Sequence, residues 1–460
     1  MRRLQRKLYE AAKQSEARHF HALFDRICRS DVLQRAWERV RSNHGSAGID
    51  GQTIEAIEES GVATFLGRIQ ADLIEGRYRP SPVRRRYIPK SDGKRRPLGI
   101  PTVRDRVVQM AAKIVIEPIF EADFLPCSYG FRPKKSALDA KEEIRVTANR
   151  RYGFVVDADI RDYFGSIPQG KLLEAVAARI SDRRVLKLIR QWLEAGVMDE
   201  GVFHDTVEGT PQGGVISPLL SNIYLHALDR EWSVRHRHVG VLVRYADDFV
   251  ILCRGEGNAK EAKRRVESIL SGLGLTLHPE KTKLVEIRDG KESFEFLGCT
   301  FRKKRSIQRA PSLYFLQRWP RPKAMKTIRS RIHDLTDTRH SGKDLKQMIR
   351  SLNPVLVGFA NYHRNGNADA KFNALDHYVR DRLLRWMRRR GGQRSRPIRQ
   401  RQWPHERFFE MGLAQLRTRV RYPAQATPRR PSVSRVRETR THGLKGDLAL
   451  NSVHGPKERD

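Results

Sequence analysis

The stretch Val243-Arg-Tyr-Ala-Asp-Asp-Phe-Val-Ile-Leu-Cys253 sets two adjacent acids between two apolar, strand-like runs. This pattern predicts a β-hairpin with Asp247 and Asp248 at its bend. Two neighbouring carboxylates in apolar surroundings are costly to bury, so a solvated turn or a divalent cation must offset their charge. A plain hairpin turn is the alternative, and the rest of the chain must decide between the two.

The chain as a whole is strongly basic. Its 460 residues include 90 Lys and Arg against 53 Asp and Glu, which gives a formal net charge of +37. The hydrophobic fraction of 39% is compatible with a folded protein. Such an excess of positive charge predicts a nucleic acid partner, whose binding should weaken steeply with salt because counterions are released.

Other features of the sequence disfavour several classes of protein. There is no long apolar span and no lipidation signal, so we expect no membrane partner. The basic start, Met1–Leu8, lacks the apolar core of a secretory signal, which predicts a cytosolic, cytoplasmic protein. Cys28, Cys127, Cys253 and Cys299 are scattered without a paired C-x-x-C motif, which argues against disulfide scaffolds and zinc ribbons.

Hydropathy periodicity divides the chain into four segments. Residues 1–75 carry a helical pattern, and residues 76–310 alternate strands with helices. Residues 311–390 are almost wholly helical in pattern, and residues 391–460 are rich in Arg, Pro, Gly and Ser. We therefore expect an α+β core, then an all-α domain, and then a basic tail that is mostly flexible.

Nucleotidyl transfer is the reaction that the acidic hairpin and the basic composition together favour. It uses two Mg²⁺ ions bridged by carboxylates, one activating the attacking hydroxyl and the other neutralising the triphosphate. A third acid should come from a neighbouring strand, and Asp159 ends the buried run 155–160, with Asp157 as a weaker candidate. Asp159 alone is better explained as an acid that caps a turn, but beside the hairpin pair a metal site is favoured.

A series of motifs along residues 17–390 resembles those of group II intron-encoded reverse transcriptases and maturases, in the order of that family. They are Ala47-Gly-Ile-Asp-Gly51, Ile88-Pro-Lys90 with Arg96-Pro-Leu-Gly-Ile-Pro101, Ser128-Tyr-Gly-Phe-Arg-Pro133, Asp159-Ile-Arg-Asp-Tyr-Phe164, Gly209-Thr-Pro-Gln-Gly-Gly-Val-Ile-Ser-Pro218, Tyr245-Ala-Asp-Asp248, Glu280-Lys-Thr-Lys283 and Phe296-Leu-Gly298. The Gly209–Pro218 block is the most specific, since it resembles this family more than the retron or diversity-generating branches.

The resemblance implies an RNA-directed DNA polymerase with a right-hand fold. It assigns residues 1–75 to an N-terminal extension and the start of the fingers, 76–310 to the fingers and palm, 311–390 to the helical thumb or maturase domain X, and 391–460 to the basic tail. It further implies that Asp159, Asp247, Asp248 and the backbone carbonyl of Ile160 hold two Mg²⁺ ions. The expected partners are intron RNA, a duplex of RNA template and DNA primer, and dNTPs.

The same resemblance gives roles to further positions. Phe164 would lie beneath the sugar of the incoming nucleotide and exclude a 2′-hydroxyl, with ordinary core packing as the alternative. Lys90 and Arg96 would contact the triphosphate, Gln212 the nascent pair or template, and Lys281 or Lys283, between which the sequence does not choose, would protonate pyrophosphate. Arg385, Arg388, Arg389 and Arg390 would grip RNA or duplex phosphates. Each of these residues also has a plain explanation as a solvated charge or a loop amide.

Two departures from the family pattern refine the expectation. Gly165 follows Phe164 where many relatives carry Asp, and no paired-cysteine or His-Asn-His pattern follows the thumb. We therefore expect a bacterial type that lacks the endonuclease domain. The competing interpretation is an RNA-binding splicing factor with a vestigial polymerase site, against which the presence of all three acids argues. The sequence does not indicate an oligomeric state.

Overall fold

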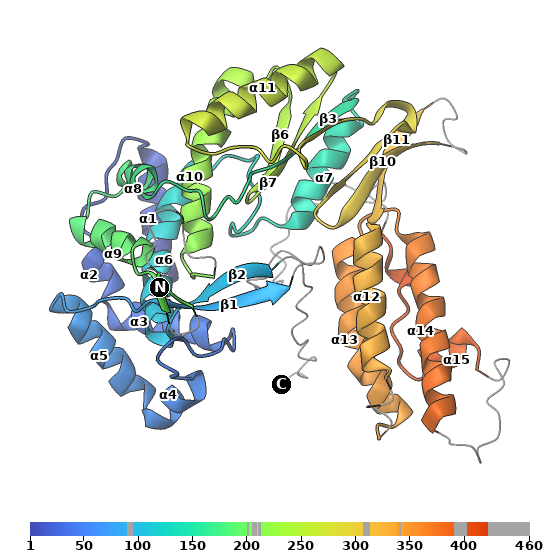
Figure 1. The fold of residues 1–460 in the computed structure, drawn as a ribbon, viewed down its shortest axis with the longest axis horizontal. Helices are drawn as coiled ribbons and strands as arrows, with labels where there is room; N and C mark the ends of the chain where they lie inside the picture. Colours follow the sequence, from blue (N-terminus) through green and yellow to red (C-terminus); the bar gives the residue numbers. More distant parts are fainter. Residues whose placement is uncertain are drawn as a thin grey trace. The chain divides into compact units, whose positions relative to one another are not determined.

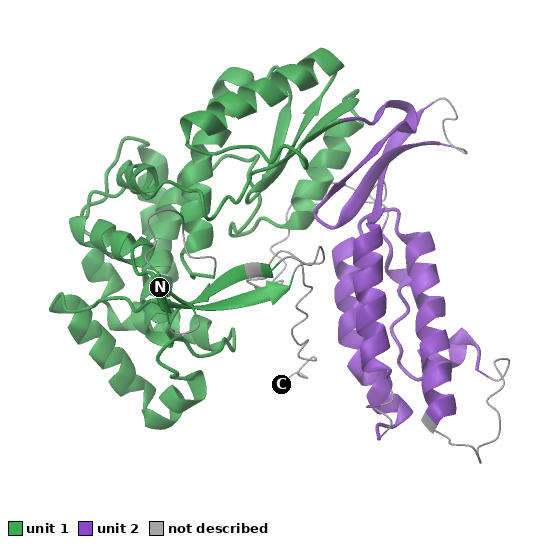
Figure 2. Cartoon of the chain, in the orientation of Figure 1, with its two compact units in different colours: residues 1–284 green, residues 285–460 purple. Residues whose placement is uncertain are grey.

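The structure is a computed structural model that describes residues 1–89, 95–199, 202–204, 209, 213–306, 313–337, 339, 342–390 and 403–421. The chain divides into two compact units, Met1–Leu284 and Val285–Asp460 (Figure 2). Lys90 and Gln212, and the side chains of Arg96 and Arg390, lie outside the described residues. The roles predicted for them are therefore not addressed by the structure.

The helices of the first unit surround one long buried helix. They are α1 (Arg2–Gln14), α2 (Phe24–Ile27), α3 (Ser30–Arg41), α4 (Ile54–Ser60), α5 (Val62–Ile74), α6 (Val103–Asp123), α7 (Ala137–Ala148), α8 (Gln169–Ala177), α9 (Arg183–Leu193), α10 (Ser217–Glu231) and α11 (Glu256–Gly272). Almost every residue of α6 is buried, because its apolar side chains extend all round the helix and contact α1, α2, α3 and α10. This helix forms the centre of the core.

The acidic hairpin belongs to a four-stranded sheet. Its strands are β3 (Phe154–Asp159), β6 (Val241–Tyr245), β7 (Asp248–Cys253) and β8 (Lys283–Glu286), in the order β6-β7-β3-β8 (Figure 1). Helices α7 and α11 pack against these strands, so β3 and β7 are buried apart from Asp157, Asp159 and Asp248. The expected α+β palm is confirmed, since the apolar runs of β6 and β7 do form the predicted hairpin.

A second sheet in the first unit carries many arginines. Its strands are β1 (Val83–Pro89), β2 (Arg95–Ile100), β4 (Val197–Asp199) and β5 (Val202–His204), in the order β2-β1-β4-β5. Strands β1 and β2 pair antiparallel, with Ile88 opposite Arg96. These two strands therefore form a basic hairpin.

The second unit joins a three-stranded sheet to a helical bundle. Its sheet has the order β11-β10-β9, with β9 (Ser293–Phe296), β10 (Cys299–Arg305) and β11 (Tyr314–Pro320), and its helices are α12 (Pro322–Leu335), α13 (Leu345–His363), α14 (Asp369–Arg390) and α15 (His405–Glu410). Helix α12 packs against α13 and α14, and α14 also packs against α15. The core of this bundle includes the fully buried Phe359 and Phe372. The predicted helical domain after the α+β core is confirmed.

One part of the predicted flexible tail is folded. Residues 403–421 pack against the bundle, and Phe408 and Leu416 are completely buried there. The sequence predicts a tail that is mostly flexible, and this segment is an ordered part of it, because its few apolar residues bury enough surface against α13 and α14 to order it.

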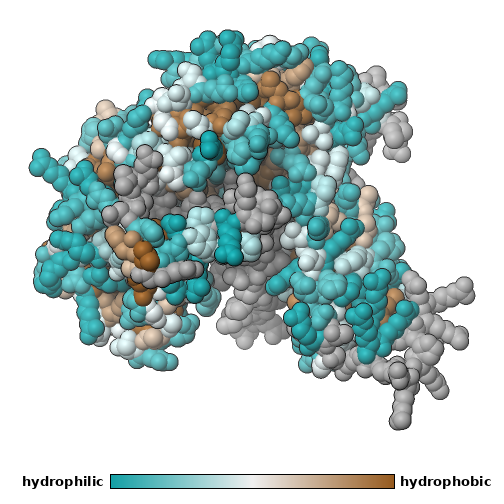
Figure 3. All heavy atoms as spheres, viewed as in Figure 1, coloured by the Kyte–Doolittle hydropathy of each residue, from teal (hydrophilic) through white to brown (hydrophobic). Residues whose placement is uncertain are grey.

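The surface of the molecule agrees with the basic composition. Figure 3 shows a face covered largely by hydrophilic side chains. Among the helices that the structure describes, none has the length and apolar character needed to cross a membrane.

Candidate active site

The pairing of β3 with β7 sets Asp159 directly opposite Asp248. Side chains at opposed positions of an antiparallel pair share one face of the sheet, with Cβ atoms about 4.5–5.5 Å apart. Both residues are half-buried, at the last position of β3 and the first position of β7. The structure thus brings the acid predicted from the separate strand to the acid of the hairpin.

Asp247 lies in the tight turn that joins β6 to β7. Tyr245 pairs with Asp248, so Ala246 and Asp247 form the two-residue turn. Ala246 has φ +58°, in the left-handed region, which such turns require and which costs a residue with a Cβ about 1–2 kcal/mol. Asp247 is only 9% exposed. A strained turn therefore fixes the backbone of Asp247 directly before Asp248.

The donor chemistry of these acids fits a divalent cation, because carboxylate oxygens are the hard ligands that Mg²⁺ and similar ions prefer. Within the residues that the structure describes, however, no three His, Cys, Asp or Glu side chains lie close enough together to hold a metal ion. The facing pair is Asp159 and Asp248, with Asp247 contributed by the adjoining turn. The backbone thus brings the donors together, whereas the side chains do not form a closed three-carboxylate site.

Lys281 lies against the first of these acids. Its Nζ is 2.7 Å from Oδ2 of Asp159, which places a positive charge beside the carboxylates. Lys283 instead begins β8, and both lysine side chains are exposed. The structure therefore separates two lysines that the sequence motif left equivalent.

The segment before Lys281 pairs with the end of β3. The amide of His278 donates to the carbonyl of Asp159 at 2.7 Å, and the amide of Arg161 donates to the carbonyl of Thr276 at 2.9 Å. Ile160 lies between these two bonds and is 3% exposed. The pairing does not use the carbonyl of Ile160, which is the group predicted to contact a metal.

Phe164 is half-buried and lies edge-on to Tyr163, with ring centroids 5.3 Å apart. Tyr163 is buried, and its hydroxyl donates to the carbonyl of Ser221 at 2.8 Å. Burial raises the pKa of Tyr163 well above its ordinary value, so the hydroxyl stays protonated as a donor. This bond fixes the backbone that carries Phe164.

The glycines of the Gly209–Pro218 block lie against two other motifs. Gly209 has φ +83°, and a Cβ there would lie 2.6 Å from the carbonyl oxygen of Phe164. Gly213 has φ +116°, and a Cβ there would lie 2.9 Å from a methyl group of Leu98 in β2. Only glycine allows both approaches. The block therefore runs from the Phe164 turn to the β2 strand that carries Arg96.

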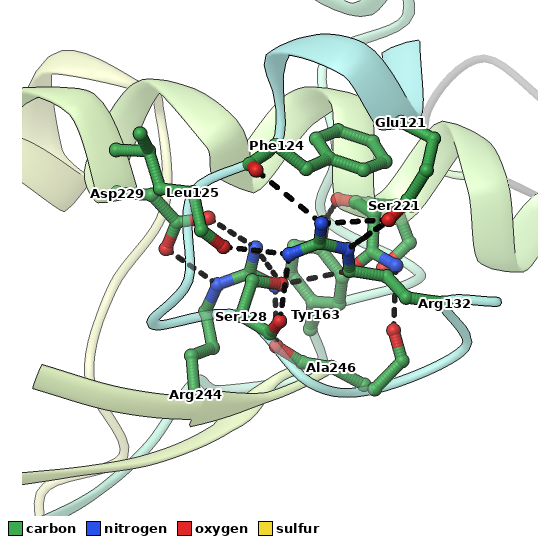
Figure 4. A network of polar contacts seen from close by, with 12 residues as sticks. Glu121, Phe124, Leu125, Ser128, Arg132, Tyr163, Ser221, Asp229, Arg244 and Ala246 are labelled. Atoms are coloured by element: carbon green, nitrogen blue, oxygen red, sulfur yellow. Dashed lines mark hydrogen bonds and ion pairs between the residues drawn. The ribbon is translucent and has the colours of Figure 1, made fainter. Parts of the chain in front are cut away.

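Arg244 is completely buried and binds the backbone of the acidic turn (Figure 4). Arg244 donates to Oδ1 of Asp229 at 2.7 Å and to the carbonyl oxygen of Ala246 at 3.0 Å. It also donates to Ser128 Oγ at 2.8 Å and to Asn222 Oδ1 at 3.1 Å. Burial works against its charge, but the carboxylate of Asp229 raises the pKa of Arg244 above its ordinary value.

The Ser128–Pro133 motif contributes further residues to this network of polar contacts (Figure 4). Arg132 donates to Glu121 at 2.7 Å and to the carbonyl of Ser128 at 2.8 Å. Gly130 lies against the backbone of Tyr245 and Ala246, where a Cβ would be 2.9 Å from the carbonyl carbon of Tyr245. This motif therefore shapes the acidic turn.

Sequence reasoning did not single out Arg244, Asp229 or Asn222. The sequence did contain one signal that could have identified them. Arg244 is a charged residue inside the apolar strand Val241–Tyr245, and a buried arginine requires a partner. That partner, Asp229, lies on α10 and is identified only by the tertiary structure.

The arginines predicted to grip nucleic acid lie in the second unit. Arg385, Arg388 and Arg389 are exposed near the C-terminal end of α14. They are accessible to a polyanion, and their predicted role stays a prediction.

A right-hand palm with an acidic hairpin, followed by a helical domain, defines the class of template-directed polymerases. Residues 88–301 match the family "Reverse transcriptase (RNA-dependent DNA polymerase)". Residues 325–403 match the "Group II intron, maturase-specific domain". The two matches fall in the α+β part of the chain and in its helical bundle, respectively.

Two curated proteins show the relationship in more detail. The chain is 36% identical over 341 residues to Protein YkfC of Escherichia coli (strain K12), which covers 66% of this chain and 88% of that protein. It is 38% identical over 217 residues to the Group II intron-encoded protein LtrA of Lactococcus lactis subsp. cremoris, which covers 46% of this chain and 35% of LtrA. The chain thus belongs to the family of group II intron reverse transcriptases with a maturase domain.

Among solved structures, the chain is similar to the partial Cas6-RT-Cas1--Cas2 complex, with a TM-score of 0.35 and 23% identity over 54% of this chain and 41% of that chain. Family membership gives the chain RNA-directed DNA polymerase activity and a nucleic acid partner. Reverse transcriptases generally use divalent metals.

Proposed function

We propose that the chain extends a DNA primer with dNTPs on an RNA template at Asp159, Asp247 and Asp248, and also binds its intron RNA to assist splicing. The observation that carries this proposal is the register that sets Asp159 opposite Asp248 at the acidic turn. The arginines of the bundle suit the phosphates of intron RNA. We propose that both activities, primer extension and splicing assistance, take place in the bacterial cytosol.

The three acids would hold two Mg²⁺ ions, which supply charge neutralisation at the triphosphate and activation of the primer 3′-hydroxyl when bound. Asp159 and Asp248 present oxygens from one face of the sheet, and Asp247 adds the third carboxylate from the turn. Lys281, whose ammonium lies 2.7 Å from Asp159, would donate the proton to the leaving pyrophosphate.

Primer extension on an RNA template tests the proposal. The purified chain should incorporate dNTPs in the presence of Mg²⁺, and a chelator should stop the reaction. Binding of intron RNA without any extension would instead favour the alternative, a splicing factor with a vestigial polymerase site.

We expect Lys281→Ala to lower the rate of dNTP incorporation about a hundredfold, because it removes the ammonium beside Asp159 and with it general acid catalysis. Lys283→Ala is the matched control, since this lysine lies two positions further on and is exposed on β8. It should change the rate less than about threefold. Single-turnover rates on one primer–template would compare them, and equal losses would contradict the assignment of Lys281.

Phe164→Ala should relax the choice of sugar. The ring of Phe164 is half-buried against Tyr163, so its removal leaves the backbone in place and opens space for a 2′-hydroxyl. The ratio of kcat/KM for dNTP to that for NTP should fall about tenfold or more. Tyr163→Phe keeps both rings and removes only the hydroxyl that bonds to Ser221, so it tests the support of this backbone without opening the space. An unchanged ratio in Phe164→Ala would show that the ring of Phe164 is only packing.

A further inference from the structure

Three arginines that pair with no acid among the described residues lie together in the second unit. Arg364 follows the last residue of α13, and Arg419 and Arg421 come from the folded segment after α15. The amide of Arg421 donates to the carbonyl of Arg364 at 2.8 Å. Residues far apart in the sequence are therefore neighbours in the structure.

The segment that brings Arg419 and Arg421 to this place is firmly held. The carboxylate of Asp376 accepts from the amides of Leu416 at 3.1 Å and Arg417 at 3.2 Å. The side chain of Asn353 accepts from the amide of Ala414 at 2.9 Å and donates to the carbonyl of Gly412 at 2.8 Å. These bonds join side chains of the bundle to the backbone of the segment. The backbone path of the segment therefore does not depend on which side chains are present at positions 419 and 421.

The charges in this group are not neutralised by any acid in the described parts of the chain. In the part of the chain that the structure describes, no ion pair joins Arg364, Arg419 or Arg421 to an acid, whereas the neighbouring Arg417 pairs with Asp369 at 3.1 Å. Burial lowers the pKa of Arg364, and the positive charges of Arg421 and Arg419 lower it further. Its Nε is buried and has no hydrogen-bond acceptor among the described residues. A bound anion would relieve this repulsion.

We propose that Arg364, Arg419 and Arg421 form a binding site for the backbone phosphates of folded intron RNA. Guanidinium groups match phosphate oxygens in pairs, and the net charge of +37 attracts a polyanion. Arg364 lies within the region that matches the maturase-specific domain, residues 325–403, and the other two lie beyond it. The naming of intron RNA as the occupant rests on the function proposed above.

The triple variant Arg364→Gln, Arg419→Gln, Arg421→Gln tests this site. Its affinity for intron RNA in filter binding should fall about tenfold or more, and the slope of log K against log salt should fall by about two to three units. Single-turnover extension of a saturating primer–template should stay within about twofold. The matched control is Arg264→Gln, Arg265→Gln, Arg288→Gln, which removes three arginines that pair with Glu261 and Glu286.

Equal weakening by the two triple variants would show that only net charge matters and would overturn the site, as would an unchanged affinity in the first. Thermal unfolding checks that each variant is folded. If the triple variant is unstable, the single variant Arg421→Gln replaces it in the test. Arg421 is exposed, and its bond to Arg364 is made by the backbone amide of residue 421, which the substitution keeps. The slope of log K against log salt should then fall by about one unit. The polymerase acids are untouched, so these results are separate from the test of the proposed function.

Discussion

Asp247→Ala is expected to lower the rate of dNTP incorporation on an RNA template at least about a thousandfold, because a carboxylate that holds a catalytic cation contributes several kcal/mol to the transition state. Affinity for RNA should stay within a few fold, since that affinity depends on Lys and Arg side chains away from the turn. Asp247 is 9% exposed, and the smaller alanine fits its place. The loss should therefore be chemical and not a failure to fold.

Single-turnover extension beside filter binding would measure both quantities. Asp162→Asn is the matched control, because Asp162 is an exposed acid of the same motif as Asp159 and its φ of +39° suits asparagine. This control should extend primers at close to the normal rate. Undiminished extension by Asp247→Ala would refute the site. If splicing assistance depends on the RNA scaffold alone, Asp247→Ala should still promote splicing at low Mg²⁺.

Asp229→Asn should destabilise the first unit and also slow the reaction. Arg244 and Asp229 are both completely buried, so the substitution leaves a buried guanidinium without its counter-ion and should cost about 3–5 kcal/mol of unfolding free energy. Arg244 also donates to the carbonyl of Ala246, so a displaced guanidinium would release the strained turn that carries Asp247. We expect kcat of the folded protein to fall about tenfold, with little change in the KM for dNTP.

Asp123→Asn separates the two effects. Asp123 pairs with the buried Arg179 at 2.9 Å, and Arg179 donates to the carbonyl of Ala12 in α1 at 2.9 Å, away from the acidic turn. This variant should lose stability in urea unfolding but keep its kcat at a temperature where it is folded. An equal loss of kcat in both variants would show that Arg244 only stabilises the fold.

A second substitution tests the mechanism at the turn itself. Ala246→Gly removes the cost of the left-handed φ of +58° at this position. If Asp229→Asn acts by releasing the turn, adding Ala246→Gly should restore part of the lost kcat without restoring stability. No recovery would indicate that the turn keeps its conformation without the Arg244 bond.

The alternation of apolar runs and acids along the chain was enough to predict the palm hairpin and the strand that ends at Asp159. The hairpin closes over two residues, and its register follows from its own sequence, because strand periodicity and turn length are local properties. The motifs also identified the family. What the pattern did not contain was the register between β3 and β7, which sets Asp159 opposite Asp248 across a long stretch of intervening chain.

The sequence by itself determined the class of protein, the α+β order of elements and the helical domain, because these depend on local patterns and on motif order. Only the tertiary structure decided that Lys281 and not Lys283 lies at Asp159, that Asp229 is the partner of Arg244, and that residues 403–421 fold onto the bundle. These outcomes depend on which distant side chains become neighbours. A buried charge needs a partner wherever one lies in the chain, and a short apolar segment is ordered only when a surface exists to cover it.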